Sequence, residues 1–480
     1  MLATALTTAL PSMIEDFGMS VTTGQWLTSG YSLAMGIMMP LTAFLINRFP
    51  TRKLYLTAMV CFIAGLAVCV AAPNFPALMA GRVLQACGNG IMTSMAQVII
   101  LTIYPAEKKG SAMGWYGLSV GAAPVIAPTL AGLVVDTFGW RMIFYISIAI
   151  MAAAFVFALR VFGNVLETEE KRFDVLSFII SAFAFGGITL GIGNVGSYPF
   201  VSVMVLLPLA VGAAAAVFFV YRQLSLSEPF LEIRILKNRN YALSVIGSMV
   251  LYLVMMGSSV ILPLYVQTIM GLSATVSGLV ALPGSLVMAV ISPFAGKIYD
   301  KLGMKVLFVS GAALMLLSNA GMTLITTDTS VVVAAVLNAV RCAAIGCLMM
   351  PLITWGTSGL GGGTTAHATA LLTSLRTIAG AIGSAVFVSI MTAVGNGSAV
   401  GYGDGAMMHG LNVTFMAMGL ASAALLLIAI FGVKRNKEQI KHIKRSGRII
   451  SPGVLHYDFF LELDARNASG DIPTYLTNAR

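Results

Sequence analysis

Charge is scarce in this 480-residue sequence. Only 10% of the residues are Asp, Glu, Lys or Arg, whereas 58% are hydrophobic. A soluble globular domain carries about 25% charged residues. These proportions exclude a soluble protein and indicate an integral membrane protein.

The residue types that build catalytic and metal sites are also sparse. The five cysteines lie inside apolar stretches with no CxxC or Cys/His spacing, which argues against a disulfide framework or a metal site. His367 and His409 lie near predicted helix ends, where we interpret them as polar interface residues, and no carboxylates are paired within an apolar stretch. The glycine-rich GLGGGTTA (359–366), predicted as a loop, lacks the Gly-Lys-Ser/Thr of a phosphate-binding loop. We therefore expect no enzyme activity, no nucleotide and no cofactor.

What the sequence has in abundance is apolar segments of about twenty residues, the length that a helix needs to cross a bilayer. We place spans near 25–46, 54–72, 77–104, 111–135, 141–162, 174–193, 200–221, 241–265, 276–296, 305–325, 331–354, 367–394 and 411–433. A partial span at 1–12 precedes them. The sequence thus predicts an all-α integral membrane protein with about fourteen transmembrane helices.

The distribution of charge gives the orientation. Alternate loops carry basic residues, such as Arg48, Lys108/Lys109 and Lys297, whereas the opposite loops carry Asp136, Asp328 and Asp404. The positive-inside rule places the basic loops and both termini in the cytoplasm, with the chain in the cell membrane. The net charge of +10 therefore reflects topology and anionic lipid headgroups, with no nucleic-acid partner expected.

A repeated motif divides the chain into two halves. Two stretches at the basic end of a predicted span share a pattern, PLTAFLINRFPTRK (40–53) and PFAGKIYDKLGMK (293–305). About forty residues later, each half carries a lone arginine, Arg82 or Arg341. Two parallel halves are the layout of a transporter that rocks one half against the other. We expect an N-terminal bundle at 1–162, an extra helix pair and central loops at 163–240, a C-terminal bundle at 241–433 and a basic tail at 434–480.

Arg82 lies in an apolar helix, where burying a charge costs several kcal/mol. The guanidinium either reaches the outer headgroups as a snorkelling anchor or shares a polar pocket with Gln85, which lies one helical turn away on the same face. Because a guanidinium does not deprotonate in proteins, Arg82 cannot itself take up and release a proton.

Several motifs in the expected order carry a family resemblance over residues 1 to 433. They are the 43–53 loop signature, RVLQACGNG from Arg82, GLSVGAAPVIAPTLAG (117–132) and LLTSLRTIAGAIGSA (371–385). The chain resembles the major facilitator superfamily, specifically the fourteen-helix drug:proton antiporters that include multidrug and lincomycin-type exporters. Ala43, Asn47 and Pro50 replace the Gly, Asp and Gly of the usual loop signature.

The resemblance implies a major facilitator fold, with two six-helix bundles plus an extra helix pair, and a set of site residues. It implies roles in proton coupling and transport for Arg82, Gln85, Arg341 and Arg376. The basic turns would latch the two halves together through Asn47, Arg48, Arg52, Lys53, Asp300 and Lys301. The antiporter helix is marked by Gly117, Gly121, Pro124, Pro128 and Gly132, where small residues permit close packing and the prolines would bend the helix.

Function is predicted with alternatives. The first is proton-coupled export of lipophilic or cationic drugs by alternating access, performed by a monomer that binds a small-molecule substrate and protons. The alternatives are export of a defined metabolite, lipid or siderophore, and a non-transporting membrane sensor. The family's first helix usually carries an early acidic residue where Leu2 and Ala3 stand here, so we expect further helix upstream. If there is none, Asp136, Glu15 and Asp16 are the nearest acidic candidates.

Overall fold

The computed structural model describes residues 2–19, 21–166, 168, 173–195, 198, 201–358, 360, 362–398 and 403–433. Residues 1–435 form one compact unit, and 436–480 are assigned to a second. The predicted basic tail at 434–480 lies outside the described residues, as do Lys171 and Arg172.

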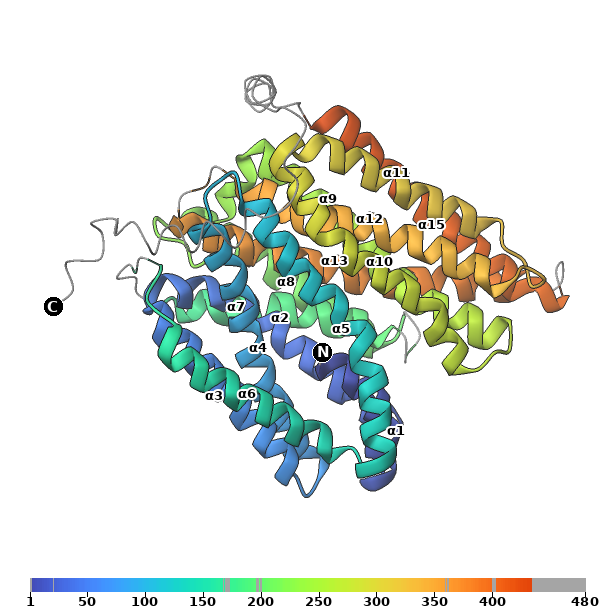
Figure 1. Ribbon diagram of the computed structural model, residues 1–480, viewed down its shortest axis with the longest axis horizontal. Helices are drawn as coiled ribbons and strands as arrows, with labels where there is room; N and C mark the ends of the chain where they lie inside the picture. The colour runs from blue at the N-terminus through green and yellow to red at the C-terminus, as the bar shows by residue number, and fades with distance from the viewer. Residues whose placement is uncertain are drawn as a thin grey trace, which may run out of the picture. The chain divides into compact units, whose positions relative to one another are not determined.

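The described residues form fourteen long α-helices joined by short turns (Figure 1). They are α1 (Leu2–Asp16), α2 (Val21–Arg48), α3 (Thr51–Ala71), α4 (Phe75–Ile103), α5 (Lys109–Phe138), α6 (Arg141–Val161), α7 (Val175–Asn194), α8 (Val203–Ser225), α9 (Arg239–Leu264), α10 (Ala274–Leu302), α11 (Met304–Thr323), α12 (Val331–Thr357), α13 (Gly362–Gly397) and α15 (Ala406–Leu427). Short helical turns are η1 (Ile233–Lys237), η2 (Tyr265–Ile269), η3 (Gly403–Gly405) and η4 (Ile428–Gly432). The predicted all-helical membrane architecture is confirmed.

Twelve of these helices are long and apolar enough to cross a membrane. The remaining two are α1, whose fifteen residues are shorter than the about twenty that a span requires, and α5, several of whose side chains lie outside the described residues. The predicted count of fourteen spans is therefore supported only approximately. One boundary was wrong: α13 begins at Gly362, so most of the stretch that we interpreted as a glycine-rich loop is its first turn.

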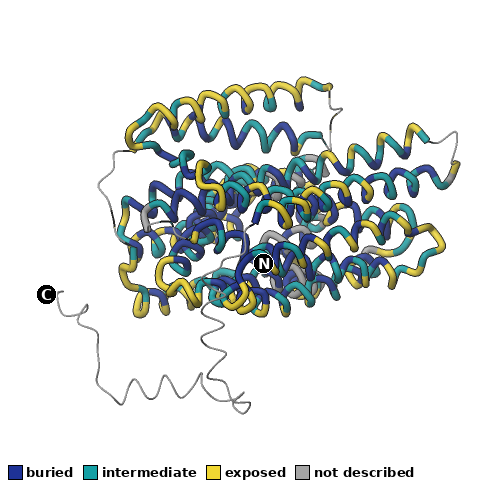
Figure 2. Tube along the Cα trace, turned by 90° about the horizontal axis from the view of Figure 1, so that it is seen from above, coloured by how far each residue is buried: buried dark blue, intermediate teal, exposed yellow. Residues whose placement is uncertain are grey.

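Helices at the two ends of the chain pack into separate halves. In the N half, α3 and α2 pack on α4, α6 packs on α3, and α1 packs on α5. In the C half, α10 packs on α12, α9 on α13, and α15 on α11 and α13. The pair α7/α8 packs internally and reaches both halves through α7, which contacts α2 and α13. Exposed residues cover the outward sides of the peripheral helices, as expected of a lipid-facing surface (Figure 2).

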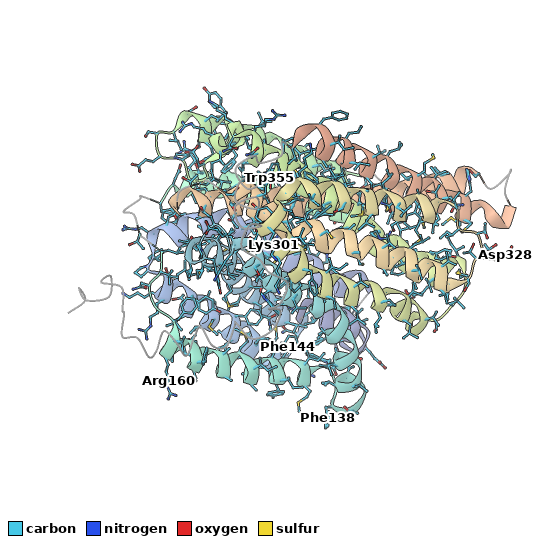
Figure 3. All side chains as sticks on the ribbon, turned by 45° about the horizontal axis from the view of Figure 1, so that its top comes forward. Phe138, Phe144, Arg160, Lys301, Asp328 and Trp355 are labelled. Carbon is cyan, nitrogen blue, oxygen red and sulfur yellow. The ribbon has the colours of Figure 1, made fainter. Side chains whose placement is uncertain are left out.

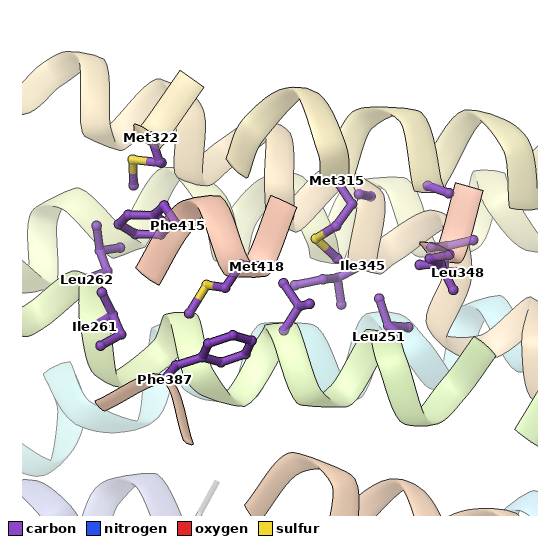
Figure 4. Close-up of a cluster of buried hydrophobic side chains, with 14 of the residues drawn as sticks. Leu251, Ile261, Leu262, Met315, Met322, Ile345, Leu348, Phe387, Phe415 and Met418 are labelled. Carbon is purple, nitrogen blue, oxygen red and sulfur yellow. The ribbon is translucent and has the colours of Figure 1, made fainter. Parts of the chain in front are cut away.

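The core of the C half is built from bulky apolar side chains contributed by α9, α11, α12, α13 and α15 (Figure 4). Phe308, Phe415 and Met418 are fully buried there. In lipid every backbone polar group must find a partner inside the chain, which is why these apolar sequences form helices. Packing of the side chains then fixes how each helix contacts its neighbours.

The two ends of the helices differ in charge. The basic end carries Arg48, Lys108, Arg160 and Lys301 at helix termini, and the acidic end carries Asp16 and Asp328. Arg160 and Asp328 lie at opposite ends in Figure 3.

The repeated motif ends in two different turns. In the C half, Gly303 alone joins α10 to α11 with φ of 75°, a conformation that glycine adopts without strain. In the N half, Phe49 and Pro50 join α2 to α3, and Pro50 has φ of −54°. Proline fixes φ near −65° and cannot adopt the backbone conformation of Gly303. With Pro50 at the corresponding position, the connection in the N half takes two residues outside the helices, whereas the connection in the C half takes one.

Candidate functional site

The C-half motif binds the N half through Asp300. Its Oδ1 accepts from the backbone N–H of Gly110 at 2.8 Å, and its Oδ2 accepts from that of Ser111 at 2.7 Å. Both amides belong to the first turn of α5, whose N-terminus carries unsatisfied donors and a partial positive charge. A carboxylate of one half thus caps a helix of the other half at the basic end.

The N-half motif makes the corresponding contact with the C half. Asn47, only 5% exposed, places its Nδ2 3.1 Å from Nε2 of His367, which lies near the start of α13 and 320 residues away in sequence. The pair borders a small cavity that is also lined by Asp174 and Phe230, which flank the extra helix pair. The two repeats therefore clamp α13 and α5 in related ways, one through a neutral pair and one through a carboxylate.

Glycines allow α5 and α10 to approach closely next to the Asp300 contact. A Cβ added to Gly114 would lie 2.6 Å from the carbonyl oxygen of Ser292, and one added to Gly296 would collide with the carbonyl oxygen of Gly110. A Cβ on Gly117 would lie 3.1 Å from Cβ of Ser292, and one on Gly121 would lie 3.3 Å from Cα of Ala289. The first two glycines of the antiporter motif thus form part of the contact surface between the halves.

The contact surface between α5 and α10, which includes Asp300, is called the seam below. Other signature residues lie apart from it. The Arg52 guanidinium donates to the Leu159 carbonyl at 2.6 Å, which ties α3 to α6 within the N half. Arg48 is half-buried, and Lys53 and Lys301 are exposed. Helix α5 is continuous through Pro124, Pro128 and Gly132, and the side chains of both prolines lie outside the described residues.

Arg82 is fully buried in the N half and does not reach the bilayer surface. Its Nη1 donates to Oε1 of Gln85 at 2.7 Å, and its Nε donates to the Leu27 carbonyl at 3.1 Å. The guanidinium carbon lies 4.0 Å from the ring centroid of Tyr31, a distance typical of a cation–π contact. Of the two alternatives for Arg82, the structure has the polar pocket shared with Gln85, and the pocket joins α4 to α2.

Arg341 occupies a similar pocket in the C half. It is 1% exposed, its Nη2 donates to Oδ1 of Asn338 at 2.8 Å, and its guanidinium carbon lies 5.8 Å from the Phe415 ring centroid. In each half, then, a buried arginine is held by an amide three residues away on its own helix. Asn338 was missed from the sequence, although it has the Arg82–Gln85 spacing in reverse order.

Arg376 is the third buried arginine and lies on α13, which packs against α2 and α4 of the N half as well as α9 of the C half. It is 5% exposed, and its guanidinium carbon lies 4.7 Å from the Tyr252 ring centroid. Among the described residues, Arg376 shares no hydrogen-bond or ring partner with Arg82 or Arg341.

The acidic candidates are peripheral. Asp16 ends α1 at the acidic end, where the Arg141 guanidinium donates to it at 2.8 Å and the Trp140 indole at 3.1 Å. These two hydrogen bonds hold the pKa of the Asp16 carboxyl below its usual range. Glu15 is exposed next to it, and the side chain of Asp136 lies outside the described residues, as do those of Leu2 and Ala3.

Comparisons with known proteins identify the family. A model of the major facilitator superfamily matches residues 1–384. An uncharacterized MFS-type transporter of Bacillus subtilis strain 168, YcnB, is 37% identical over 89% of this chain and 90% of its own length. The lincomycin resistance protein LmrB of the same organism is 35% identical over 81% of this chain and 82% of its own, and the multidrug export protein EmrB of Escherichia coli K12 is 26% identical over 81% and 77%.

Solved structures show the same fold. The proton:xylose symporter XylE, bound to 6-bromo-6-deoxy-D-glucose, superposes with a TM-score of 0.60 at 15% identity, covering 92% of this chain and 95% of that one. The human organic anion transporter MFSD10 gives a TM-score of 0.58 at 15% identity over 86% and 88%. The predicted fold and the resemblance to lincomycin-type and multidrug exporters are therefore confirmed. The chain belongs to the major facilitator superfamily of membrane transporters.

Proposed function

We propose that this transporter exports lipophilic small molecules from the cell in exchange for protons, working as a monomer by alternating access. The observation that carries the proposal is the pair of repeat-related contacts at the basic end, Asp300 with α5 and Asn47 with α13. Both are small, polar and reversible, so the halves can separate there without disrupting either apolar core. The names of its relatives LmrB and EmrB favour drugs as the cargo.

The basic end faces the cytoplasm in this proposal. Arg48, Lys108, Arg160 and Lys301 all lie there, and retention of Lys and Arg on the cytoplasmic side is the strongest topological bias in membrane proteins. When the basic end is closed, the transporter is open to the outside, where it releases cargo and takes up protons. When the basic end is open, the transporter binds cargo from the cytoplasm, and alternation between the two states exports the cargo.

Arg82 couples the proton to this movement. Its three contacts, with Gln85, the Leu27 carbonyl and the Tyr31 ring, hold α4 against α2. A planar guanidinium can make all three at once, whereas the lysine ammonium is a point charge with different geometry. A change of protonation near this pocket would alter the α4–α2 contact and so bias the two states.

Inside-out membrane vesicles test the function. With an acidic lumen, vesicles containing the wild-type chain should accumulate radiolabelled lincomycin or the lipophilic dye Hoechst 33342, and nigericin should abolish the accumulation. Arg82→Ala and Arg82→Lys should retain membrane insertion and binding of the compounds but lose proton-driven accumulation. Accumulation that persists after nigericin, or wild-type activity in Arg82→Lys, would contradict the coupling role.

A further inference from the structure

Helix α13 carries an unusual group of buried polar atoms. Among the described residues, no hydrogen-bond partner is found for the hydroxyls of Thr369, Thr373 and Ser374 or for Nε and Nη1 of Arg376. Thr369, Thr373 and Arg376 follow the i, i+4, i+7 spacing and therefore share one face of the helix. Unpaired buried donors are costly, and natural structures keep few of them without a functional reason.

The two threonines depart from what other helical threonines of this chain do. Thr377 and Thr392 on the same helix each donate to the carbonyl four residues earlier, at 2.8 Å and 3.0 Å. Thr414 on α15 does the same at 2.8 Å. This back-bonding is the usual way for a membrane helix to satisfy a hydroxyl. The hydroxyls of Thr369 and Thr373 do not use it, so they remain available to another acceptor or donor.

Side chains from both halves surround Arg376. The Tyr252 ring of α9 lies beneath the guanidinium at 4.7 Å. Tyr116 of α5 hydrogen-bonds with Gln97 of α4 and lies within electrostatic range of Arg376 and Tyr252. Oε1 of Gln97 is buried without a partner among the described residues. A ligand at Arg376 would therefore lie next to the Tyr252 ring, with Tyr116 and Gln97 of the N half in the same polar region.

The charge of the protein interior favours one class of ligand. Arg82, Arg341 and Arg376 are all buried, whereas the acidic residues before residue 436 lie within two residues of a helix end or between helices. A cation brought next to Arg376 would meet uncompensated positive charge, and at low dielectric this repulsion is strong. An anion would be attracted and would accept hydrogen bonds from the guanidinium.

We propose that Arg376 is a binding site for the anionic head of an amphipathic cargo, an aromatic or aliphatic carboxylate in particular. The guanidinium Nε and Nη1 donate to the carboxylate, Thr369 and Thr373 complete its hydrogen bonds, and Tyr116 and Tyr252 contact the apolar part. The physiological role rests on the proposed export function, but the site itself predicts binding that is measurable without transport. It adds lipophilic anions to the expected cargo, as the class of compound that binds at Arg376.

Three probes that differ only in the head group test the site. They are 4-(1-pyrenyl)butanoate, 4-(1-pyrenyl)butanol and 4-(1-pyrenyl)butylamine, whose binding to the full chain in nanodiscs is measured by equilibrium dialysis against empty nanodiscs. The wild type should bind the carboxylate at least tenfold more tightly than the amine. Arg376→Gln should weaken carboxylate binding by about tenfold or more, since a charge-assisted hydrogen bond is lost, and leave binding of the alcohol within about twofold.

Threonine variants supply a matched control that does not alter charge. Thr373→Val should weaken carboxylate binding several-fold, whereas Thr377→Val should not, because that hydroxyl is already bonded to its own helix. Alcohol binding reports folding in every variant. Equal carboxylate affinity in wild type and Arg376→Gln, absence of carboxylate binding to the wild type, or tighter binding of the amine would each overturn the proposal.

The same variants separate this inference from the transport function. Proton-driven accumulation of lincomycin together with carboxylate binding that ignores Arg376 would refute the anion site and leave export standing. Arg376-dependent carboxylate binding in a chain that shows no proton-driven accumulation of any compound would refute the proposed coupling and leave the site standing.

Discussion

Replacing Asp300 with Asn should loosen the basic end of the transporter. The carboxylate accepts two backbone hydrogen bonds from the first turn of α5, at 2.8 Å and 2.7 Å. Asparagine offers one acceptor oxygen, and its NH₂ group would face the second amide. The variant therefore loses one hydrogen bond to a charged group, about 1.5–3 kcal/mol, and the favourable charge at a helix N-terminus, about 0.3–1 kcal/mol.

Taking the lower part of that range, the closed seam loses about 2 kcal/mol. Because each 1.4 kcal/mol is a factor of ten, its opening equilibrium should rise by about 30-fold. The amides of Gly110 and Ser111 report this directly, since they exchange with deuterium only when the Asp300 contact opens. In Asp300→Asn, hydrogen–deuterium exchange of these two amides, measured within a peptide covering 105–116, should accelerate by about that factor, while exchange in α3 stays unchanged.

Two variants bracket the expected effect. Asn47→Ala removes a neutral hydrogen bond worth about 0.5–1.5 kcal/mol, so it should accelerate exchange by less than about tenfold and slow turnover less than Asp300→Asn does. Asp328→Asn makes the same chemical change at the acidic end and should have no effect on the segment. If residues 105–116 exchange equally fast in Asp300→Asn and the wild type, the contact does not hold the seam closed and the reasoning fails.

The remaining predictions concern packing and pH. Gly296→Ala should impair transport strongly at normal expression because its Cβ would strike the Gly110 carbonyl oxygen, whereas Gly36→Ala, with nothing within 4 Å of the added Cβ, should transport at the wild-type rate; equal activity of the two would exclude a tight seam. Burial raises the pKa of the Asp174 carboxyl, but hydrogen bonds from Ser177 and Arg222 outweigh it and hold the pKa below the ordinary 3.8. The stabilisation from this carboxylate is therefore present above the ordinary pKa of 3.8 and is lost as pH falls through the lowered pKa, so the wild type should melt at a higher temperature than Asp174→Asn at pH 7, by a margin that shrinks as the pH is lowered below 3.8. A melting difference that grows as the pH falls would contradict this sign.

The helices could be predicted because each depends on its own segment. Spans placed near 54–72, 141–162 and 305–325 correspond to α3, α6 and α11 with boundaries that differ by three residues at most, because apolar runs bounded by Pro, Gly and charge leave little freedom. The predicted start of α13 was wrong because glycine and threonine have low helix propensity, so the sequence there does not indicate a helix by itself. In this protein Thr365 and Ala366 near that start are buried, and tertiary packing overrides propensity.

The site was predictable only where it is local. The Arg82–Gln85 pair follows from spacing along one helix. Spacing does not show which residue of another helix faces a given position, so the Asn47–His367 pair and the rings beside Arg376 were not foreseen. The free hydroxyls of Thr369 and Thr373 also depend on a rotamer choice that the sequence does not display.

The repeated motif gives the two halves related contacts of unequal strength, and this inequality bears on how the transporter opens. Asp300 binds two backbone amides of α5, which do not depend on the identity of a polar side chain there. Asn47 binds the ring of His367, a neutral contact that depends on one side chain and on its tautomer. A hydrogen bond to a charged group is worth about 1.5–3 kcal/mol and a neutral one about 0.5–1.5 kcal/mol, so we infer that the Asp300 contact is stronger than the hydrogen bond between Asn47 and His367. On this inference, opening of the basic end requires that α10 release α5 along the glycine-lined surface where the two helices approach closely.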